Sequence, residues 1–189
     1  MFTNGVAWTK WNGRWGALSS KGEVLFDAVL DEKPLFDKAG VAWIRNGVCW
    51  GAVRSDGSVA FDFIVEHQPI FGEDGVAWVR WNNRWGAIAR RGNILFDAMV
   101  EQEPLFDEGG VAWAKWNSLW GVVRHSGEVL LEASLGSEPV FDRNGIAWVE
   151  RSGEWIVVDK LGNIISEVAV AAKPVFEDKN YAWVEWNGK

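Results

Sequence analysis

The sequence holds little of the chemistry that most enzymes and metal sites use. Cys49 is the only cysteine among 189 residues, so an intrachain disulfide is excluded. The only two histidines, His67 and His125, stand at different positions of the repeat described below and cannot form a repeated metal site. The chain also has no Gly-rich phosphate loop, no paired-cysteine zinc spacing and no HExxH motif. We therefore expect a protein that is not an enzyme and that uses no metal and no cofactor.

Positive charge and long apolar runs are also scarce. The 19 lysines and arginines are outnumbered by 26 aspartates and glutamates, which gives a net charge of −7. That sign disfavours binding to the phosphates of nucleic acids and to acidic membrane surfaces. No stretch reaches the roughly 18 apolar residues of a membrane helix, and the N-terminus lacks the charged segment and apolar run of a secretory signal. We expect a cytoplasmic protein with neither nucleic acid nor membrane as its partner.

Tryptophan is what the sequence has in excess, because 15 tryptophans accompany a single tyrosine. Their spacing reveals a period of 35 residues, which five kinds of position keep without an insertion or a deletion. These columns are Trp8, Trp43, Trp78, Trp113, Trp148 and Trp183; Trp15, Trp50, Trp85, Trp120 and Trp155; Pro34, Pro69, Pro104, Pro139 and Pro174; Gly22, Gly57, Gly92, Gly127 and Gly162; and Phe36, Phe71, Phe106, Phe141 and Phe176. The chain is one repeat domain, 1–189, with repeats of approximately 1–33, 34–68, 69–103, 104–138 and 139–173 and a partial repeat, 174–189.

The fourth repeat shows the expected secondary structure clearly. Four short runs, PLF, VAWAKW, LWGVVRH and EVLLEAS, are separated by turn-forming residues. The pair Asn117–Ser118 tolerates positive φ and suits a tight hairpin, as do Asn12–Gly13 and Asn82–Asn83 in other repeats. No run keeps a 3.6-residue apolar period. The pattern predicts four-stranded antiparallel meanders and no helices.

The second run of each repeat indicates how the sheets pack. Val76, Ala77, Trp78 and Val79 are all apolar, whereas a sheet with one wet face alternates polar and apolar residues. With no helix available, the neighbouring repeat must cover the second face. We expect an all-β fold, a five- (or six-) bladed β-propeller, with an open β-solenoid of stacked meanders as the alternative.

A short motif that follows the hairpin turn resembles a known family. NGRWGAL (12–18), CWGAV (49–53), NNRWGAI (82–88) and LWGVV (119–123) resemble the WG (KWG-type) repeat of bacterial proteins, and the resemblance covers the whole chain. It implies a β-strand repeat architecture and little about function, since most members lack an assigned role. The fifth repeat departs from the motif, because Ile156 stands where the others have glycine, and we expect that strand to pack differently.

The two ends of the sequence resemble each other. The last fourteen residues, 176–189, repeat the first fourteen, 1–14. The segment Pro174–Phe176 could supply the innermost strand that the first blade lacks and so close a five-bladed ring. Residues 181–186 would then duplicate 6–11 and pair with another subunit or within a longer array. The alternative is that the chain is a piece of a longer repeat protein.

The tryptophans divide into a predicted core and a candidate binding surface. Trp8, Trp15 and their equivalents lie inside apolar runs, and we expect them to pack between repeats. A third tryptophan column, which begins at Trp11, has Asn46 in the second repeat and Arg151 in the fifth. Its tryptophans are therefore expected to be partly exposed beside the hairpin turn. The candidate ligand- or partner-binding residues are Trp11, Trp81, Trp116, Trp186, Asn12, Asn82 and Asn117.

Two functions are compatible with such a surface. The first is a non-catalytic interaction module that presents repeated tryptophan-bearing hairpins to a protein partner or to further copies of itself. The alternative is a multivalent, lectin-like protein that stacks sugar rings on the exposed indoles. The recurring aspartates Asp37, Asp107 and Asp142 are expected to accept backbone N–H bonds and hold turns, rather than to bind metal.

Overall fold

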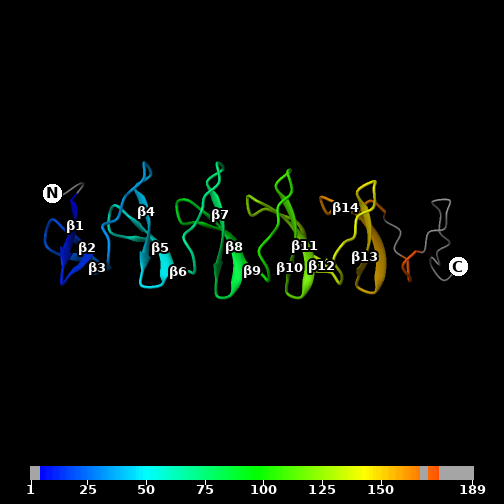
Figure 1. Cartoon of the computed structure of the whole chain (residues 1–189), viewed down its shortest axis with the longest axis horizontal. Helices are drawn as coiled ribbons and strands as arrows, with labels where there is room; N and C mark the ends of the chain where they lie inside the picture. Colours follow the sequence, from blue (N-terminus) through cyan, green and yellow to red (C-terminus); the bar gives the residue numbers. More distant parts are fainter. Residues whose placement is uncertain (1–4, 167–169, 175–189) are drawn as a thin grey trace. The chain divides into compact units, whose positions relative to one another are not determined.

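The computed structural model describes residues 5–166 and 170–174, and these residues form strands and turns with no helix (Figure 1). The all-β prediction is therefore confirmed. The strands are β1 (Val6–Trp11), β2 (Arg14–Ser19), β3 (Val24–Leu30), β4 (Val41–Asn46), β5 (Cys49–Arg54), β6 (Val59–Val65), β7 (Val76–Trp81), β8 (Arg84–Ala89), β9 (Ile94–Val100), β10 (Val111–Trp116), β11 (Leu119–Arg124), β12 (Val129–Leu135), β13 (Ile146–Arg151) and β14 (Glu154–Asp159).

Each of the first four repeats forms a sheet of three strands, not the four that the sequence predicted. The sheets have the orders β1-β2-β3, β4-β5-β6, β7-β8-β9 and β10-β11-β12, and β13-β14 form a two-stranded sheet. The expected first strand, Pro-x-Phe, lies in an extended linker that joins no ladder, residues 33–37 in the first linker. The physical reason is that proline donates no ladder hydrogen bond, and that the Asp37 N–H turns inward to the Val41 carbonyl oxygen, 2.9 Å away.

The predicted hairpin turns are confirmed. The first two strands of every repeat are joined by two residues, and both have positive φ at Asn12–Gly13 (52° and 81°) and at Asn82–Asn83 (53° and 61°). Positive φ at both central residues defines the type I′ turn, whose twist matches that of the flanking strands. The asparagines of these turns are exposed.

The third strand pairs irregularly with the second in the first, second and fourth repeats. In the first sheet, Trp15 pairs with Leu30 and Ala17 with Phe26, so β3 carries more residues than β2 between the same two pairs. The same shift occurs between β5 and β6 and between β11 and β12. Such bulges bend the strand and push its backbone out of the regular ladder.

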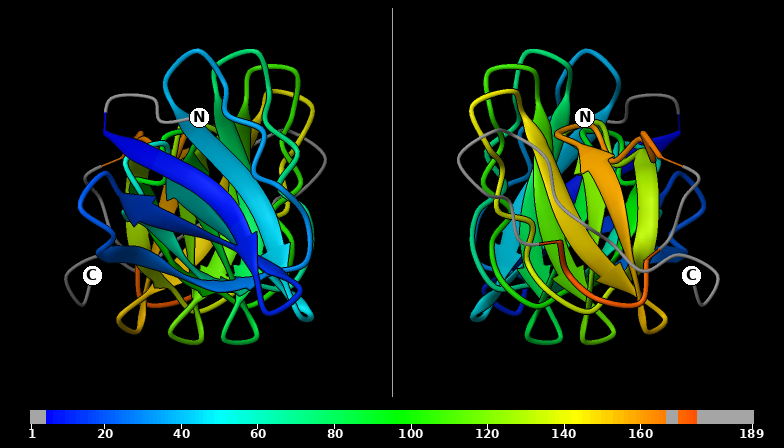
Figure 2. Two further views of the ribbon diagram at one scale, coloured as in Figure 1. Left: turned by 90° about the vertical axis from the view of Figure 1, so that its left-hand side faces the viewer. Right: turned by 90° about the vertical axis from the view of Figure 1, so that its right-hand side faces the viewer.

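The chain divides into two compact units, Met1–Ala98 and Met99–Lys189, referred to below as unit 1 and unit 2. In unit 1 the first sheet stacks on the second, and Figure 2 (left) looks onto the face of the first sheet with the second behind it. Leu30 of β3 and Ile44 of β4 belong to one buried cluster, and Val65 of β6 and Ile88 of β8 to the next. Each interface between sheets of unit 1 thus has its own core.

The prediction that both faces of the second run are covered is confirmed in unit 1. Val76, Ala77 and Val79 are between 1% and 6% exposed, and Trp78 is half-buried. In unit 2, Leu135 of β12 packs with Val149 of β13 and Val158 of β14 in a cluster of the same kind. Consecutive repeats within a unit therefore bury each other's apolar faces.

Three sequence-based predictions concern residues beyond those described. The ring-closing strand would need Phe176, and the surplus strand would be 181–186; both fall outside the described residues, as do Trp183 and Trp186. Pro174, at the edge of the described part, is buried.

Candidate functional site

The third tryptophan column, which the sequence placed at the surface, is buried. Trp81 and Trp116 are 4% and 3% exposed, and Trp11 is half-buried, so the predicted exposure is wrong at Trp81 and Trp116. Their ring faces are covered by protein, while Asn82 and Asn117 beside them remain exposed. The indoles of this column therefore fill the sheets instead of offering a stacking surface.

The glycine of the WG motif explains this burial. A Cβ on Gly86 would overlap Cη2 of Trp81, and it would lie 2.7 Å from the Phe96 carbonyl oxygen and 2.8 Å from the Ala98 nitrogen. Gly16 and Gly121 stand in the same relation to Trp11 and Trp116. Glycine is required because the indole on one side and the bulged third strand on the other both approach closer than a side chain permits.

The repeats that lack this tryptophan fill its place differently. In the second repeat Asn46 replaces the tryptophan, and the ring of Phe63 lies against Gly51 where the first, third and fourth repeats have a small alanine on the third strand. In the fifth repeat Arg151 takes the tryptophan position and Ile156 takes the glycine position. In the second repeat the change at the tryptophan position therefore accompanies an exchange of volume within the sheet, whereas Arg151 of the fifth repeat is exposed.

The first tryptophan column links one repeat to the next. The indole N–H of Trp43 donates to the Arg90 carbonyl oxygen at 2.8 Å, and Trp8 and Trp113 make the same bond to Ser55 and Lys160 at 3.2 and 3.0 Å. The ring of Trp43 also contacts Phe61 and Phe71, with centroids 5.6 and 5.5 Å away. These tryptophans are half-buried, so part of each ring remains open to solvent.

Unit 2 contains a groove of about 620 Å³ that is lined by one tryptophan of the first column, Trp113, and one of the second column, Trp120. This volume is within the range of small-ligand sites, about 300–1,000 Å³. Trp113 of β10 and Trp120 of β11 lie between the linker that follows β12 and the linker that precedes β10. The remaining lining residues are Glu101, Gln102, Glu103, Pro104, Leu105, Asp107, Val111, Ala114, Lys115, Glu138, Phe141 and Lys160.

Unit 1 contains an equivalent groove of about 260 Å³. Its floor is Trp43 and Trp50, and every residue that lines it stands 70 residues before a residue of the groove in unit 2. The set in unit 1 is Asp31, Glu32, Lys33, Leu35, Trp43, Ile44, Arg45, Trp50 and Gln68. The two grooves are separated by 70 residues, which is two repeats, so the groove is a property of the repeat.

An exposed aliphatic side chain recurs beside these grooves. The middle residue of each Pro-x-Phe segment points into solvent, and the four described examples are Leu35, Ile70, Leu105 and Val140, 87%, 88%, 85% and 82% exposed. The proline before it is buried, and Phe36 in the first linker packs on Trp8 with ring centroids 5.5 Å apart. Isolated exposed aliphatics are ordinary on protein surfaces, but one at the same place in four repeats calls for a common cause.

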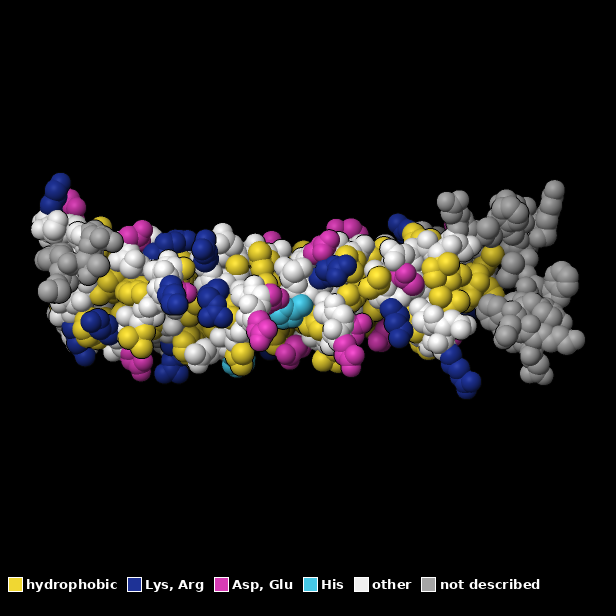
Figure 3. Space-filling view, turned by 90° about the horizontal axis from the view of Figure 1, so that it is seen from above, with side chains coloured by type: hydrophobic (Ala, Val, Ile, Leu, Met, Phe, Trp, Pro, Cys, Tyr) yellow, Lys and Arg dark blue, Asp and Glu magenta, His cyan; other side chains and the backbone are white. Residues whose placement is uncertain are grey.

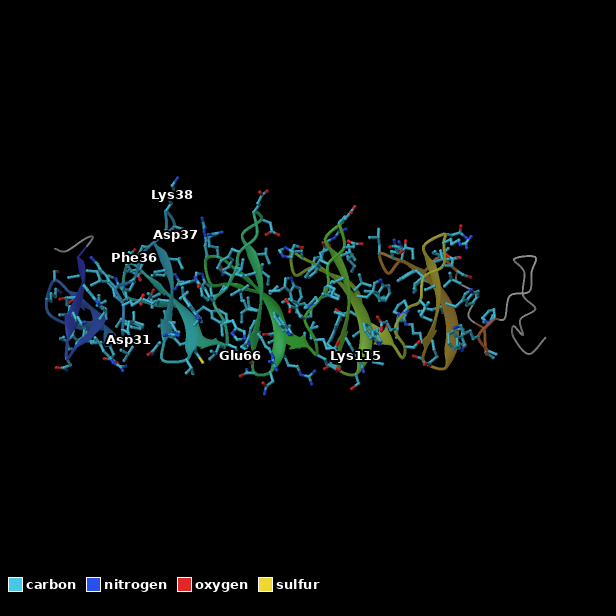
Figure 4. All side chains as sticks on the ribbon, in the orientation of Figure 1. Asp31, Phe36, Asp37, Lys38, Glu66 and Lys115 are labelled. Atoms are coloured by element: carbon cyan, nitrogen blue, oxygen red, sulfur yellow. The ribbon has the colours of Figure 1, made fainter. Side chains whose placement is uncertain are left out.

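The linkers cross each unit from one edge to the other. In unit 1, Asp31 and Glu66 lie at the edge that carries the hairpin turns, whereas Asp37 and Lys38 lie at the opposite edge (Figure 4). The space-filling view shows hydrophobic side chains among the acidic and basic ones (Figure 3).

The start of the second linker is joined to the third sheet. The Glu66 N–H donates to the Arg80 carbonyl oxygen at 3.0 Å, and the carboxylate of Glu66 and the guanidinium group of Arg80 are 3.3 Å apart.

Carboxylates hold the turns that end the linkers, as the sequence predicted. Oδ1 of Asp37 accepts the N–H groups of Ala39 and Val41, at 2.9 and 3.0 Å. Asp107 and Asp142 accept the equivalent pairs of N–H groups. The backbone hydrogen bond from Ile146 is the main cause that lowers the pKa of Asp142 below its ordinary value of 3.8.

Sequence reasoning missed the grooves, although a signal was present. It treated Pro-x-Phe as a paired strand, although an aliphatic residue stands at its centre in Leu35, Ile70, Leu105 and Val140. Among the described residues, no group of three or more histidine, cysteine, aspartate or glutamate side chains is arranged to hold a metal ion. The same part of the chain contains no helix that could cross a membrane.

Comparisons with known proteins add little to this geometry. No protein-family model matches the chain, and no curated protein is similar to it. A crystal structure of a protein of unknown function from Bacteroides caccae is 14% identical over 85% of this chain and 70% of its own, with a TM-score of 0.27. The extracellular domain of a putative one-component system from B. thetaiotaomicron is 15% identical over 76% of this chain and 24% of its own, with a TM-score of 0.28. Neither likeness bears on the function of this chain.

Proposed function

We propose that this chain is a non-catalytic binding module, similar to WG-type repeats, whose repeats hold extended polypeptide segments of a protein partner. The observation that carries the proposal is the repeated groove, with two half-buried indoles on its floor and a solvent-exposed aliphatic residue on its rim. Tryptophan is the residue most enriched where binding energy concentrates at protein interfaces. The proposed binding surface is therefore formed by the linkers and the grooves, and not by the hairpin turns that the sequence suggested.

Several features of the linker favour a polypeptide as the ligand. Residues 33–36 belong to no strand or turn, and no backbone–backbone hydrogen bond joins them to the described residues of unit 1. Their free donors and acceptors can pair with an extended partner segment, which adds as a strand, although Pro34 contributes only a carbonyl. Such a segment would bury Leu35 against its own apolar side chains. The partner would then supply the fourth strand that the sequence pattern suggests.

The repeat arrangement that accompanies this proposal is an open stack of three-stranded sheets, in preference to a closed propeller. Within unit 1 the links from Trp8 to Ser55 and from Trp43 to Arg90 both span 47 residues, so one operation relates consecutive sheets, as a ring and an open stack both require, and the size of the molecule distinguishes the two. A compact 189-residue domain has a radius of gyration of about 16 Å. We expect small-angle scattering to give a clearly larger value, and a value near 16 Å would favour the ring.

Selection from a displayed library of random 12-residue peptides tests the function. We expect the full chain to enrich peptides with alternating aliphatic residues, measured afterwards by isothermal titration calorimetry. Replacing Leu35, Ile70, Leu105 and Val140 together by serine should abolish binding without altering the fold, since all four side chains are solvent-exposed. Val48→Ser is the matched control, because Val48 is 84% exposed but lies in a hairpin turn away from the grooves.

The outcomes of this selection separate partner binding from self-association. Peptides that bind the fourfold serine variant as tightly as the wild type would disprove the proposal. Light scattering of both proteins over a range of concentrations identifies the partner: a mass that rises for the wild type only would mean that further copies of the chain occupy the grooves. A constant mass together with selected peptides would identify a different protein.

A glycan ligand is the second candidate, and one observation favours it. The groove of unit 1 is lined by Trp50, the amide of Gln68 and the carboxylates Asp31 and Glu32, which are the kinds of aromatic and polar group that hold a sugar ring. A glycan array with the full chain tests this directly. Binding of a glycan that Trp50→Ala weakens, while far-UV circular dichroism is unchanged, would favour the lectin; a blank array would remove it.

A further inference from the structure

The second tryptophan column carries a cation at both ends of the repeat series. The ammonium nitrogen of Lys33 lies 5.6 Å from the ring centre of Trp15, and that of Lys173 lies 5.4 Å from the ring of Trp155. Both lysines occupy the same place in the repeat, directly before the buried proline of the linker. The face of this tryptophan is therefore a position where the fold itself places an organic cation.

The repeats between them have no lysine at this position. The series 33, 68, 103, 138 and 173 is Lys33, Gln68, Glu103, Glu138 and Lys173. In unit 2, Glu138 and Trp120 both line the large groove, and Glu103 lines the same groove from the preceding linker. The first and fifth repeats thus have a lysine at this position, whereas the fourth repeat has Glu138 in the groove that Trp120 lines.

Two basic residues, Lys115 and Lys160, also line the groove of unit 2. The ammonium group of Lys115 is 3.9 Å from the Glu101 carboxylate, whose second oxygen also accepts the Ser118 N–H at 3.1 Å. The stem of Lys160 runs past Gly145, where its Cε would be 3.5 Å from an added Cβ. Glu103 and Glu138 are exposed, and no ion pair joins either of them to another described residue of unit 2. Two exposed carboxylates with no ion pair to the described residues of unit 2 thus line the same groove as the Trp120 indole.

We propose that the groove of unit 2 binds a lysine side chain of the partner polypeptide, with its ammonium group on the Trp120 ring and between the Glu138 and Glu103 carboxylates. This inference rests on the proposed function, because it specifies one side chain of the polypeptide that the grooves hold. We call this position over the ring of a second-column tryptophan the seat; in the first and fifth repeats the ammonium groups of Lys33 and Lys173 occupy it. The contact is solvent-exposed, so its strength depends on salt and one lysine contributes only a small part of the affinity.

A reciprocal exchange of charge between repeats tests the proposal. The probe is the peptide acetyl-Lys-Lys-Lys-Lys-amide, and the same peptide with every lysine acetylated is the neutral control. The shift of the Trp120 indole N–H resonance on titration reports binding at the seat. We expect the lysine peptide to shift this resonance saturably at low salt, and the acetylated peptide to leave it unmoved.

Three variants decide which residue carries the effect. Glu138→Lys should fill the seat as Lys33 does in the first repeat, and it should weaken binding by about fivefold or more, since cation–π contact and a carboxylate are lost together. Glu132→Lys makes the same charge change on an exposed position of β12 outside the groove and should retain binding. Lys33→Glu should open the equivalent seat, so that the Trp15 indole resonance responds to the peptide.

The outcomes distinguish this inference from the proposed function. Equal weakening by Glu138→Lys and Glu132→Lys would mean that net charge alone attracts the peptide, and it would overturn the inference. An unresponsive Trp120 resonance in a protein that still binds the library-selected peptides would also overturn it and leave the proposed function intact. Weaker lysine-peptide binding in Glu138→Lys, with binding of lysine-free selected peptides retained, is the expected result.

Discussion

At the scale of single residues, the packing of three repeats depends on a tryptophan that lies against a glycine, such as Trp81 against Gly86. Gly86→Ala should destabilise unit 1, because the new Cβ would lie 2.7 and 2.8 Å from backbone atoms of the third strand and would also overlap Trp81. Overpacking of this kind costs typically about 1–3 kcal/mol. Urea unfolding followed by circular dichroism measures the change. Gly109→Ala is the control, since its Cβ would meet only the Asp107 side chain, at 3.2 Å; equal losses in the two variants would contradict this account.

The same residues show why part of the site could not be predicted. Replacement of a tryptophan by Asn46 or Arg151 indicates an exposed position only if neighbouring residues stay constant. They do not, because Phe63 and Ile156 change in the same two repeats. The sequence contains both changes, but in the second repeat only the register shift between β5 and β6 and the approach of Phe63 to Gly51 show where the lost volume is replaced. Bulges of that size leave no mark in an alternation pattern.

At the scale of elements, local chemistry predicted the hairpins and turns well. Positive φ at the asparagine pairs and the aspartate turns follow from residue type alone. The predicted strand at Pro-x-Phe is wrong for a reason that is not local. Its backbone would need a neighbouring strand at the right distance, and the linker instead spans from one sheet to the next, which leaves Leu35 in solvent.

The turn held by Asp142 should respond to acid. Its folded pKa lies below 3.8, so the carboxylate stabilises the turn at pH above that value and the stabilisation is lost as pH falls through the folded pKa. Hydrogen exchange of the Ile146 amide, which donates to Asp142 at 3.1 Å, should therefore lose its protection in acid. Asp142→Asn keeps an acceptor oxygen but does not titrate. Its Ile146 protection should not change over the same pH range, and an identical acid response in both proteins would refute the assignment.

At the scale of the whole molecule, the period of 35 residues predicted an all-β repeat protein in which neighbouring sheets cover each other. The period alone could not decide between a ring and an open stack, because both arrangements repeat the same contacts between neighbours. What decides is the angle between consecutive sheets, and this depends on bulges and linker geometry rather than on the identity of the apolar residues.

Nearest-neighbour packing predicts that the first three repeats fold without the rest. A chain of residues 1–103 contains the whole of β9 and both clusters of unit 1, one built around Leu30 and Ile44 and the other around Val65 and Ile88. Repeat proteins need about three repeats for stability, since each repeat buries its faces only against its neighbours. We expect the far-UV circular dichroism of a β-protein and a cooperative urea transition. Residues 1–68, which retain only the first cluster intact, should unfold at a much lower urea concentration, and equal midpoints for the two fragments would show that the second interface contributes nothing.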